Sequence, residues 1–297
     1  MDAGKKILLD LLTGSLRFVV PVYQRRYSWG EAQCRQLWSD IVTAGRHPER
    51  THFTGSVVWM QEGGIGPDGV SRCQLIDGQQ RLTSVTLLLI ALAEYARERP
   101  ENLRFSADML IDRGYLVDKY ATGEGRYKLT LSGDDREVLH GMCDHVVAPD
   151  RPNHANTGSR LEANLDLFRS LAAAIDDANV VWNGLQRLEV VSVTLDQDRD
   201  EPQLVFESMN STGLDLETSD LVRNYMLMGC SMAEQKTLYE DYWLPMERVL
   251  GNLSFDVFLH DWMVVTLKKP VLKGHRHVRG IQTFRGRQFL AAHGTHA

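Results

Sequence analysis

A five-residue run, Asp77-Gly78-Gln79-Gln80-Arg81, places an acid, two amides and a guanidinium directly after an apolar, strand-like segment. If the strand turns at the glycine directly into a helix, the first backbone N–H groups of that helix are unpaired and its dipole adds partial positive charge. Such a helix start is suited to binding phosphate. Gly78 would let the backbone approach the ligand, and Arg81 would reach the phosphate oxygens as a fork donor. Gln79 and Gln80 would orient a water or a sugar hydroxyl.

The acid of this run needs a role of its own, because phosphate repels a carboxylate unless a metal lies between them. Bridging through Mg²⁺, or activation of water by it, is the coherent role for Asp77. The structural alternative is that Asp77 only caps the helix and Arg81 is an ordinary surface residue. Geometry predicted from the sequence leaves both interpretations open.

A second run, Val20–Trp29 (VPVYQRRYSW), combines arginines, tyrosines and a tryptophan within ten residues. An apolar wall can favour sulfur over oxygen on a modified phosphate while a cation holds the remaining oxygen, and aromatic rings can stack on a modified base. The alternative is that the aromatic residues are core and the arginines are surface. The candidate DNA-binding residues are Pro21, Tyr23, Gln24, Arg25, Arg26 and Trp29.

Composition limits what the chain as a whole does. Its 297 residues, 43% hydrophobic and 24% charged, are typical of a soluble globular protein with one large or two ordinary domains. A net charge of -6 argues against nonspecific coating of nucleic acid, so any such contact is a local patch. Scattered cysteines, the lack of a secretory leader and the short apolar runs predict a cytoplasmic protein without a membrane span.

The elements that must position these motifs follow from periodicity and turn residues. In the first two thirds of the chain we predict helices over Lys5–Leu12, Gly30–Ala44, Gln79–Arg99 and Ser159–Asp177, with strands over Arg17–Val22, Phe53–Gln61, Val70–Ile76 and Leu188–Leu195, and a two-stranded hairpin over Gly114–Leu131. From Pro202 onward the pattern is helical. The predicted fold class is α+β, with a helical C-terminal lobe.

Four segments occur in a fixed order: VPVYQRRYSW, FTGSVV, LIDGQQRLTS and FESMNSTGLDLETSDLVRNYML. Together, over residues 7 to about 267, they resemble the N-terminal domain of GmrSD-type modification-dependent restriction proteins, whose relatives include the phosphorothioate-sensing protein SspE. The resemblance implies a ParB/sulfiredoxin-like nucleotide- and DNA-sensing domain over residues 1–200. After this domain we expect a helical lobe over 201–270 and then a basic, flexible tail over 271–297.

The same resemblance implies that residues 77–81 form a nucleotide site, with GTP or ATP as substrate and Mg²⁺ as cofactor. The motif MNSTG...DLVRN, which supplies Asn210, Thr212 and Arg223, would close over the nucleotide or transmit its presence to the DNA site. Asp220 and Arg223 also share one helical face, so a purely structural pair is the alternative.

Members of the family recognise modified foreign DNA, and a separate HNH-type nuclease domain cuts it. No HNH-like constellation follows Leu267, so we expect the nuclease to be a domain or partner outside this chain. The predicted function is an antiphage sensor of modified double-stranded DNA that hydrolyses a nucleoside triphosphate. We favour phosphorothioate as the modification, and hydroxymethylated or glucosylated cytosine is the rival. Homodimerisation is left open.

Two other classes of function are weighed against this one. A non-catalytic DNA-binding adaptor would use the nucleotide only as a conformational ligand. A sulfiredoxin-like redox enzyme would need a reactive cysteine near the phosphate site, and Cys73, predicted inside a strand, is a poor candidate. His140, Cys143 and His145 lack the paired spacing of a zinc site, and no metal is expected there.

Overall fold

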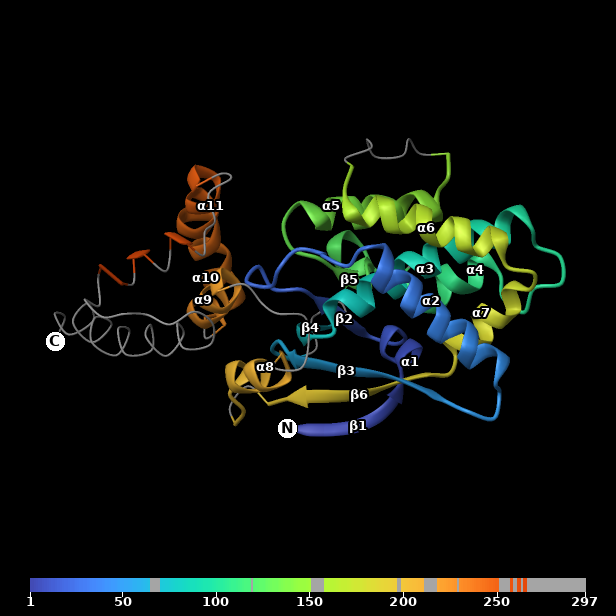
Figure 1. Ribbon diagram of the computed structural model, residues 1–297, viewed down its shortest axis with the longest axis horizontal. Helices are drawn as coiled ribbons and strands as arrows, with labels where there is room; N and C mark the ends of the chain where they lie inside the picture. Colours follow the sequence, from blue (N-terminus) through green and yellow to red (C-terminus); the bar gives the residue numbers. More distant parts are fainter. Residues whose placement is uncertain are drawn as a thin grey trace. The chain divides into compact units, whose positions relative to one another are not determined.

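The computed structural model describes residues 1–64, 70–118, 120–150, 158–196, 199–210, 218–228 and 230–250, with three short pieces at 257–258, 261–262 and 264–265 (Figure 1). The chain divides into two compact units. Met1–Pro21 and Arg26–Asp200 form the N-terminal unit, whereas Val22–Arg25 belong with the residues from Glu201 onward in the C-terminal unit. The predicted tail at 271–297, Thr212 and the side chain of Asn210 lie outside the described residues.

A six-stranded mixed sheet forms the base of the N-terminal unit, in the order β1-β6-β3-β4-β2-β5. Its strands are β1 (Asp2–Ile7), β2 (Leu16–Val19), β3 (His52–Gln61), β4 (Ser71–Asp77), β5 (Leu129–Thr130) and β6 (Leu188–Leu195). β3 runs parallel to β6 and antiparallel to β4. This mixture of sheet and helix confirms the α+β prediction.

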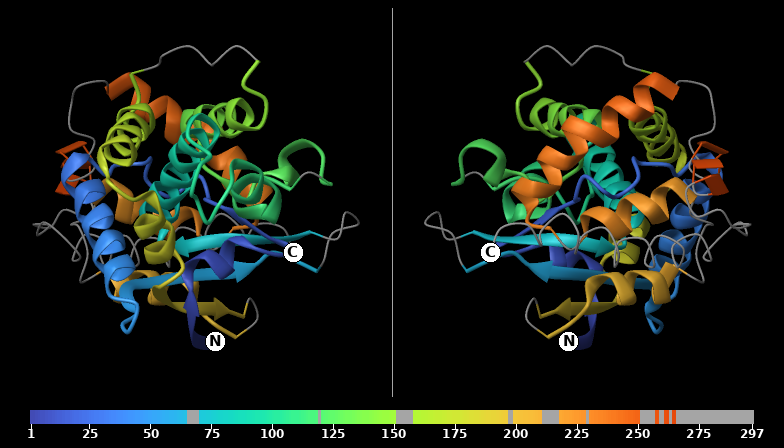
Figure 2. Two further views of the ribbon diagram at one scale, coloured as in Figure 1. Left: turned by 90° about the vertical axis from the view of Figure 1, so that its right-hand side faces the viewer. Right: turned by 90° about the vertical axis from the view of Figure 1, so that its left-hand side faces the viewer.

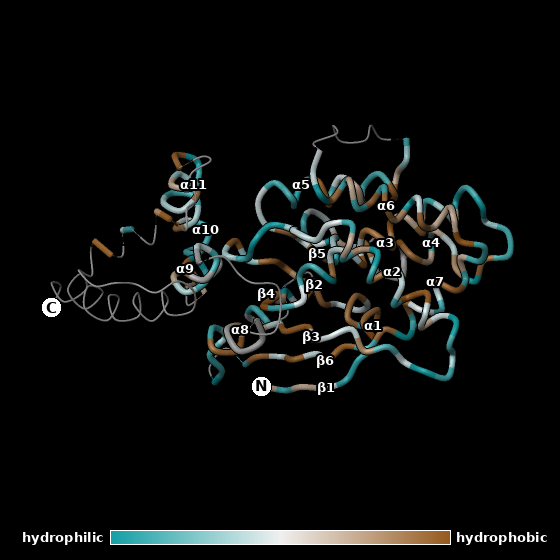
Figure 3. The backbone as a smooth tube through the Cα atoms, in the orientation of Figure 1, coloured by the Kyte–Doolittle hydropathy of each residue, from teal (hydrophilic) through white to brown (hydrophobic). Residues whose placement is uncertain are grey.

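The helices of this unit gather on one face of the sheet (Figure 2). They are α1 (Leu8–Leu12), α2 (Glu31–Arg46), α3 (Gln79–Glu98), α4 (Ala107–Leu110), α5 (Asp134–Val147), α6 (Arg160–Ala174) and α7 (Ala178–Leu185). Hydrophobic stretches run along β3 and β6, and hydrophilic residues occupy the outer loops (Figure 3). The apolar faces of sheet and helices therefore form the core.

Helix α3 is the central element because nearly its whole length is buried. The polar residues inside it are satisfied locally. Thr83, Ser84 and Thr86 each donate a side-chain hydrogen bond to the carbonyl oxygen four residues earlier, at 2.8, 2.9 and 2.9 Å. The start of α3 is thus held in a fixed position within the core.

Two predicted elements are wrong, and both errors arise from long-range strand pairing. Lys5–Leu12 is not one helix, because residues up to Ile7 form β1 and only Leu8–Leu12 is helical. β1 pairs antiparallel with β6, with Lys5 opposite Val191, a partner that local periodicity does not reveal.

The predicted hairpin over Gly114–Leu131 is the second error. This stretch contains the end of a π-helical turn at Ile111–Tyr115, a 3-10 turn at Gly123–Arg126 and a single bridge between Val117 and Tyr127. Among the described residues of this stretch the one strand is β5, which pairs parallel with β2.

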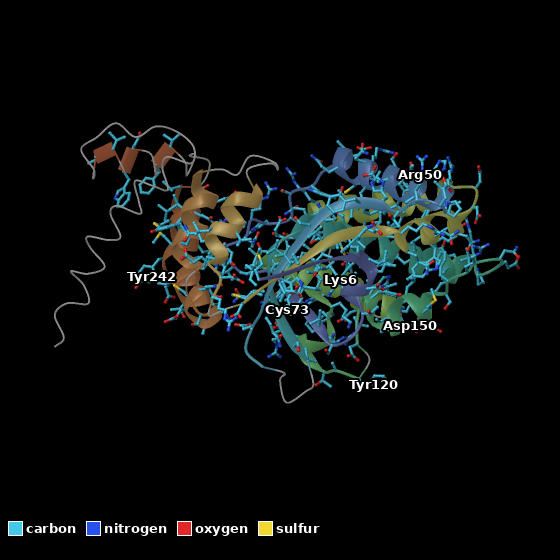
Figure 4. The ribbon with its side chains drawn as sticks, turned by 90° about the horizontal axis from the view of Figure 1, so that it is seen from below. Lys6, Arg50, Cys73, Tyr120, Asp150 and Tyr242 are labelled. Atoms are coloured by element: carbon cyan, nitrogen blue, oxygen red, sulfur yellow. The ribbon has the colours of Figure 1, made fainter. Side chains whose placement is uncertain are left out.

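All the regular elements that the structure describes in the C-terminal unit from Pro202 onward are helical. It contains α8 (Pro202–Asn210), α9 (Thr218–Leu227), α10 (Met232–Leu238), a π-helical turn (Tyr239–Trp243) and α11 (Leu244–Leu250). Tyr242 on the π-helical turn is exposed (Figure 4). None of the helices in the described ranges combines the length and apolar character that crossing a bilayer demands.

Candidate nucleotide site and aromatic segment

The predicted junction of strand and helix is confirmed: β4 ends at Asp77 and α3 begins at Gln79. Gly78 between them is the N-cap residue and has a left-handed conformation, with φ 95° and ψ 4°. A Cβ on Gly78 would lie 3.1 Å from the Ser56 carbonyl oxygen and 3.1 Å from Val57 Cγ2. Both the left-handed conformation and the close approach to β3 favour glycine at this position.

Arg81, in the first turn of α3, points back onto β3. Its Nη1 donates a 2.8 Å hydrogen bond to the Ser56 carbonyl oxygen. Gly55, with φ 101°, makes room for the guanidinium, because a Cβ there would lie 2.6 Å from Arg81 Nη2. Among the residues that the structure describes, no other acceptor takes its remaining donors. The junction therefore holds a cation with unused hydrogen-bonding capacity.

Electrostatics at the junction have two opposing parts. Burial lowers the pKa of Arg81, and the charge of the nearby Asp77 raises it. Asp77 is half-buried, and its Oδ2 accepts a 3.1 Å hydrogen bond from Ser56 Oγ. Gly78, and not Asp77, is the N-cap residue of α3, so Asp77 does not occupy the capping position that was its alternative. A partly desolvated guanidinium beside a carboxylate is an arrangement suited to a charged ligand.

Gly55 and Ser56 were not among the predicted site residues. They reach the junction because β3 pairs antiparallel with β4, with Val58 opposite Asp77 and an irregularity in register beside it. The sequence feature that could have identified them is the segment FTGSVV, which contains both residues.

Gln80 faces a different part of the N-terminal unit, the loop at Arg26–Trp29. Its Oε1 accepts hydrogen bonds from the backbone N–H groups of Ser28 and Trp29, at 2.8 and 3.2 Å. Its Nε2 donates to the Arg26 carbonyl oxygen at 3.3 Å. The amide predicted to orient a water thus holds the second half of the aromatic segment, and Gln79 beside it is buried.

The predicted DNA-binding residues differ in exposure. Pro21, Tyr23 and Gln24 are buried, and no residue in the described part of the chain makes a hydrogen bond with the Tyr23 hydroxyl. Arg26 is exposed and pairs with Asp134 at 3.0 Å. Arg25 and Trp29 are half-buried. The second half of the segment, from Arg25 to Trp29, therefore offers more surface to a ligand than the first.

Arg223 lies in the C-terminal unit, where each of its three guanidinium nitrogens donates to a protein group. Nε donates to the Tyr23 carbonyl oxygen at 2.8 Å, Nη1 to Glu247 at 2.9 Å and Nη2 to Asp220 at 2.5 Å. Trp243 lies beneath the guanidinium, with 5.9 Å from Arg223 Cζ to the ring centroid. The structural pair with Asp220 is present, and the predicted nucleotide-binding role of Arg223 stays a prediction.

A comparison with protein-family models brings these motifs together. The model of the GmrSD restriction endonuclease N-terminal domain matches residues 8–227, more than half of the chain. The chain belongs to this family. As a GmrSD N-terminal domain it is a component of a restriction system, with a role in defence. No curated protein matches in a sequence comparison, so closeness to SspE stays a prediction.

Mg²⁺ is the metal that a nucleotide site in this GmrSD domain implies. Asp77 is a single carboxylate, and no three His, Cys, Asp or Glu side chains gather in the described ranges. Mg²⁺ that arrives with a nucleotide is commonly held by one or two carboxylates, phosphate oxygens and waters. Asp77, oriented by Ser56, fits that requirement, whereas a site built only from protein ligands would not.

Cys73, the candidate for a redox reaction, lies on β4 and is labelled in Figure 4. Its side chain is fully buried, and burial raises its pKa to about 12. A thiol that stays protonated and is closed to solvent is a poor nucleophile. The environment of Cys73 therefore argues against the sulfiredoxin-like alternative.

Proposed function

We propose that this GmrSD N-terminal domain binds and hydrolyses a nucleoside triphosphate at the junction of β4 and α3. Hydrolysis there is coupled to recognition of modified DNA and regulates a nuclease domain or partner. The observation that carries the proposal is the guanidinium of Arg81. It is fixed by Ser56 and Gly55, stands beside Asp77 and keeps donors that no described protein group uses.

Binding of the phosphates would use three features of the junction. The backbone N–H groups at the start of the 20-residue helix α3, together with the helix dipole, favour an anion. Gly78 gives the phosphate access to that backbone, and Arg81 donates to its oxygens. Asp77 would hold Mg²⁺, which neutralises phosphate charge and lowers the pKa of a bound water.

Hydrolysis places demands on the same residues. Negative charge on the phosphate oxygens is redistributed in the transition state, and a fixed guanidinium stabilises it without reorganising. Because one contact to Ser56 already orients Arg81, little rotamer entropy is lost when the ligand arrives. Gln79, which is buried at the start of α3, remains our candidate for orienting the attacking water.

Steady-state phosphate release with GTP and with ATP tests the enzyme proposal. We expect Arg81→Ala to lower the rate about 100- to 1,000-fold, the usual result of removing one transition-state donor. Arg97→Ala is the matched control, since Arg97 is an exposed arginine in the last turn of the same helix. Equal rates for the two variants would refute hydrolysis at this junction. Nucleotide binding without phosphate release would favour the adaptor instead.

A gel-shift comparison tests the DNA part of the proposal. Three duplexes of one sequence are used: unmodified, with one phosphorothioate, and with hydroxymethylcytosine. We expect preference for the phosphorothioate, with affinity reduced in Arg26→Ala because that exposed cation would face phosphate. Preference for hydroxymethylcytosine would assign the rival modification, and equal affinity for all three would remove the sensor function.

A further inference from the structure

Trp29 is held more firmly than its position in a loop suggests. Its backbone N–H donates to Gln80 Oε1 at 3.2 Å, and its carbonyl oxygen accepts from Asn164 Nδ2 at 2.8 Å. Asn164 is itself buried, and it also donates to the Tyr27 hydroxyl at 3.0 Å. The indole is partly buried against the core. Contacts to α3 and α6 thus fix the backbone that carries this ring.

An open pocket of about 330 Å³ lies beside this tryptophan, within the N-terminal unit. Trp29 and Gly30 form one side of it, and Ala163 and Leu167 of α6 line another. Small-molecule sites commonly start at about 300 Å³, so the volume suits one compact ligand rather than a long one. Its aromatic and apolar lining suits a planar ring.

One cation at the pocket, Arg160, is suited to an anionic group on that ligand. The two acids that line it are already paired: Glu31 with Arg35 and Asp166 with Arg169, each at 2.7 Å. Arg160 also lines the pocket and has no carboxylate partner in the described ranges. Its Nη1 donates to the Ser28 carbonyl oxygen at 2.5 Å, which holds the cation at the rim.

We propose that this pocket binds one unstacked nucleotide unit of a DNA strand, with the base against Trp29 and a phosphate on Arg160. A base offers an indole a flat partner whatever its sequence, and a guanidinium is suited to phosphate. The proposal rests on the DNA recognition proposed above and assigns it a site distinct from the nucleotide junction. A free nucleotide has the same chemistry, so the experiment must separate the two sources.

The probe is a phosphorothioate duplex carrying 2-aminopurine, whose fluorescence rises when it leaves the base stack, at each position near the modification. We expect a rise at one position on binding of the wild-type protein. Trp29→Ala should abolish the rise and weaken binding about 5- to 150-fold, whereas Trp29→Phe, which keeps a flat ring, should retain most of both. Arg160→Ala should reduce the slope of affinity against salt by about one phosphate contact.

Because Trp29 also packs against the core, a variant that keeps it is needed. Ala163→Leu fills the pocket from an exposed position of α6 and should abolish the fluorescence rise while leaving the unfolding midpoint unchanged. Arg97→Ala is the control with unchanged binding. The second arm of the experiment follows the tryptophan fluorescence while a mononucleotide or the DNA strand is added. We expect the fluorescence to change only with the strand.

The outcomes separate this proposal from the one it rests on. If DNA binds without a fluorescence rise at any position, or if Ala163→Leu binds and responds like wild type, the pocket assignment is wrong and the sensor function stands. Occupation by the free mononucleotide alone would likewise overturn the strand as ligand. If no DNA of any kind binds, both proposals fail.

Discussion

Two arginines of the chain, Arg81 and Arg223, stand in family motifs but in opposite surroundings. Arg223 donates to a carbonyl oxygen and two carboxylates and has an aromatic ring beneath it. Arg81 donates to one carbonyl oxygen, and burial lowers its pKa against the opposing effect of Asp77. The guanidinium of Arg223 has a protein partner at each of its three nitrogens, whereas that of Arg81 has one at a single nitrogen.

The difference shows what a functional cation requires. A guanidinium has five N–H donors, and burying it without partners costs free energy. When the protein supplies a partner for each of the three nitrogens, as for Arg223, the cation organises the fold. When the protein supplies only enough contacts to fix its direction, as for Arg81, a ligand can provide the rest. The number of unused donors therefore separates the two roles better than motif membership.

The largest expected effect comes from Arg223→Ala, which leaves Asp220 and Glu247 without their shared cation in a mostly buried setting. Removing one member of a buried ion pair typically costs about 3–5 kcal/mol. We expect the C-terminal unit to lose stability by that amount, measured by urea unfolding and by protease cleavage of the residues from Glu201 onward. The apparent nucleotide affinity should fall only to the extent that the folded fraction of the protein falls.

Arg248→Ala provides the control, because Arg248 is an exposed arginine on α11 of the same unit. Its unfolding curve should match that of the wild type. If Arg223→Ala keeps the wild-type unfolding midpoint but no longer binds nucleotide, the contrast between Arg81 and Arg223 is wrong. Arg223 would then be the binding residue that the motif predicts.

Local sequence patterns predicted the scaffold of the junction better than its contacts. The strand ending near Asp77, the turn at Gly78 and the helix to about Arg99 follow from an apolar run, a glycine and helical periodicity. The strand over Leu188–Leu195 was predicted with its observed bounds. Each of these signals lies within a few residues of the feature that it determines.

What could not be predicted depends on pairing between distant residues. Ser56 contacts Arg81 only because β3 is placed antiparallel to β4 in one register. Gln80 contacts Ser28 across 52 positions of sequence, so no local pattern indicates that its amide holds a loop. The set of contacts around Arg223 likewise depends on Glu247, 24 positions away.

The next largest effect is expected from Gly55→Ala, which tests how Arg81 is fixed. A Cβ at 2.6 Å from Nη2, on a residue with φ 101°, must displace the guanidinium or the strand. Backbone strain of this kind costs about 1–3 kcal/mol. We expect that loss in the free energy of unfolding and a fall in phosphate release toward the level of Arg81→Ala.

Two further variants distinguish strain from displacement of Arg81. Gly63→Ala has a positive φ of 67° but nothing within 4 Å of its new Cβ, so it should preserve phosphate release. In the double variant Gly55→Ala/Arg81→Ala the steric conflict is gone. Its loss of unfolding free energy should therefore be smaller than the sum of the losses in the two single variants. Strict additivity would show that Gly55 does not shape the position of Arg81.

The smallest effect concerns Lys128, which can reveal the cost of burying a cation because, unlike Arg81, it titrates. Lys128 is 2% exposed, and Nζ donates to the Gly14 carbonyl oxygen. Burial, and then the charge of Arg17, lower the pKa of Lys128 to about 8, although Asp118 opposes this. In the unfolded chain a lysine has a pKa of about 10.4.

The sign of the pH dependence follows from these two values. Between about pH 8 and 10.4 the unfolded chain holds the proton of Lys128 more tightly than the folded protein does, so this group makes stability rise with pH. Below pH 8 its burial cost is fully present. Lys128→Met removes the cost, and the Gly14 carbonyl oxygen still accepts from Arg17 Nη1 at 3.0 Å. We expect the variant to be more stable than wild type at pH 7, by on the order of 1 kcal/mol.

Urea midpoints at pH 7, 8, 9 and 10 measure this advantage, which should shrink as pH rises because wild-type Lys128 loses its charge. Lys6→Met, at an exposed lysine of β1 that is labelled in Figure 4, should follow the wild-type curve. Parallel curves for Lys128→Met and wild type would mean that the surrounding groups offset the burial of this cation in full. The low number of hydrogen-bond partners at Arg81 would then no longer indicate that the buried guanidinium needs a ligand. The contrast with Arg223 would have no support from the free energy of burying a cation.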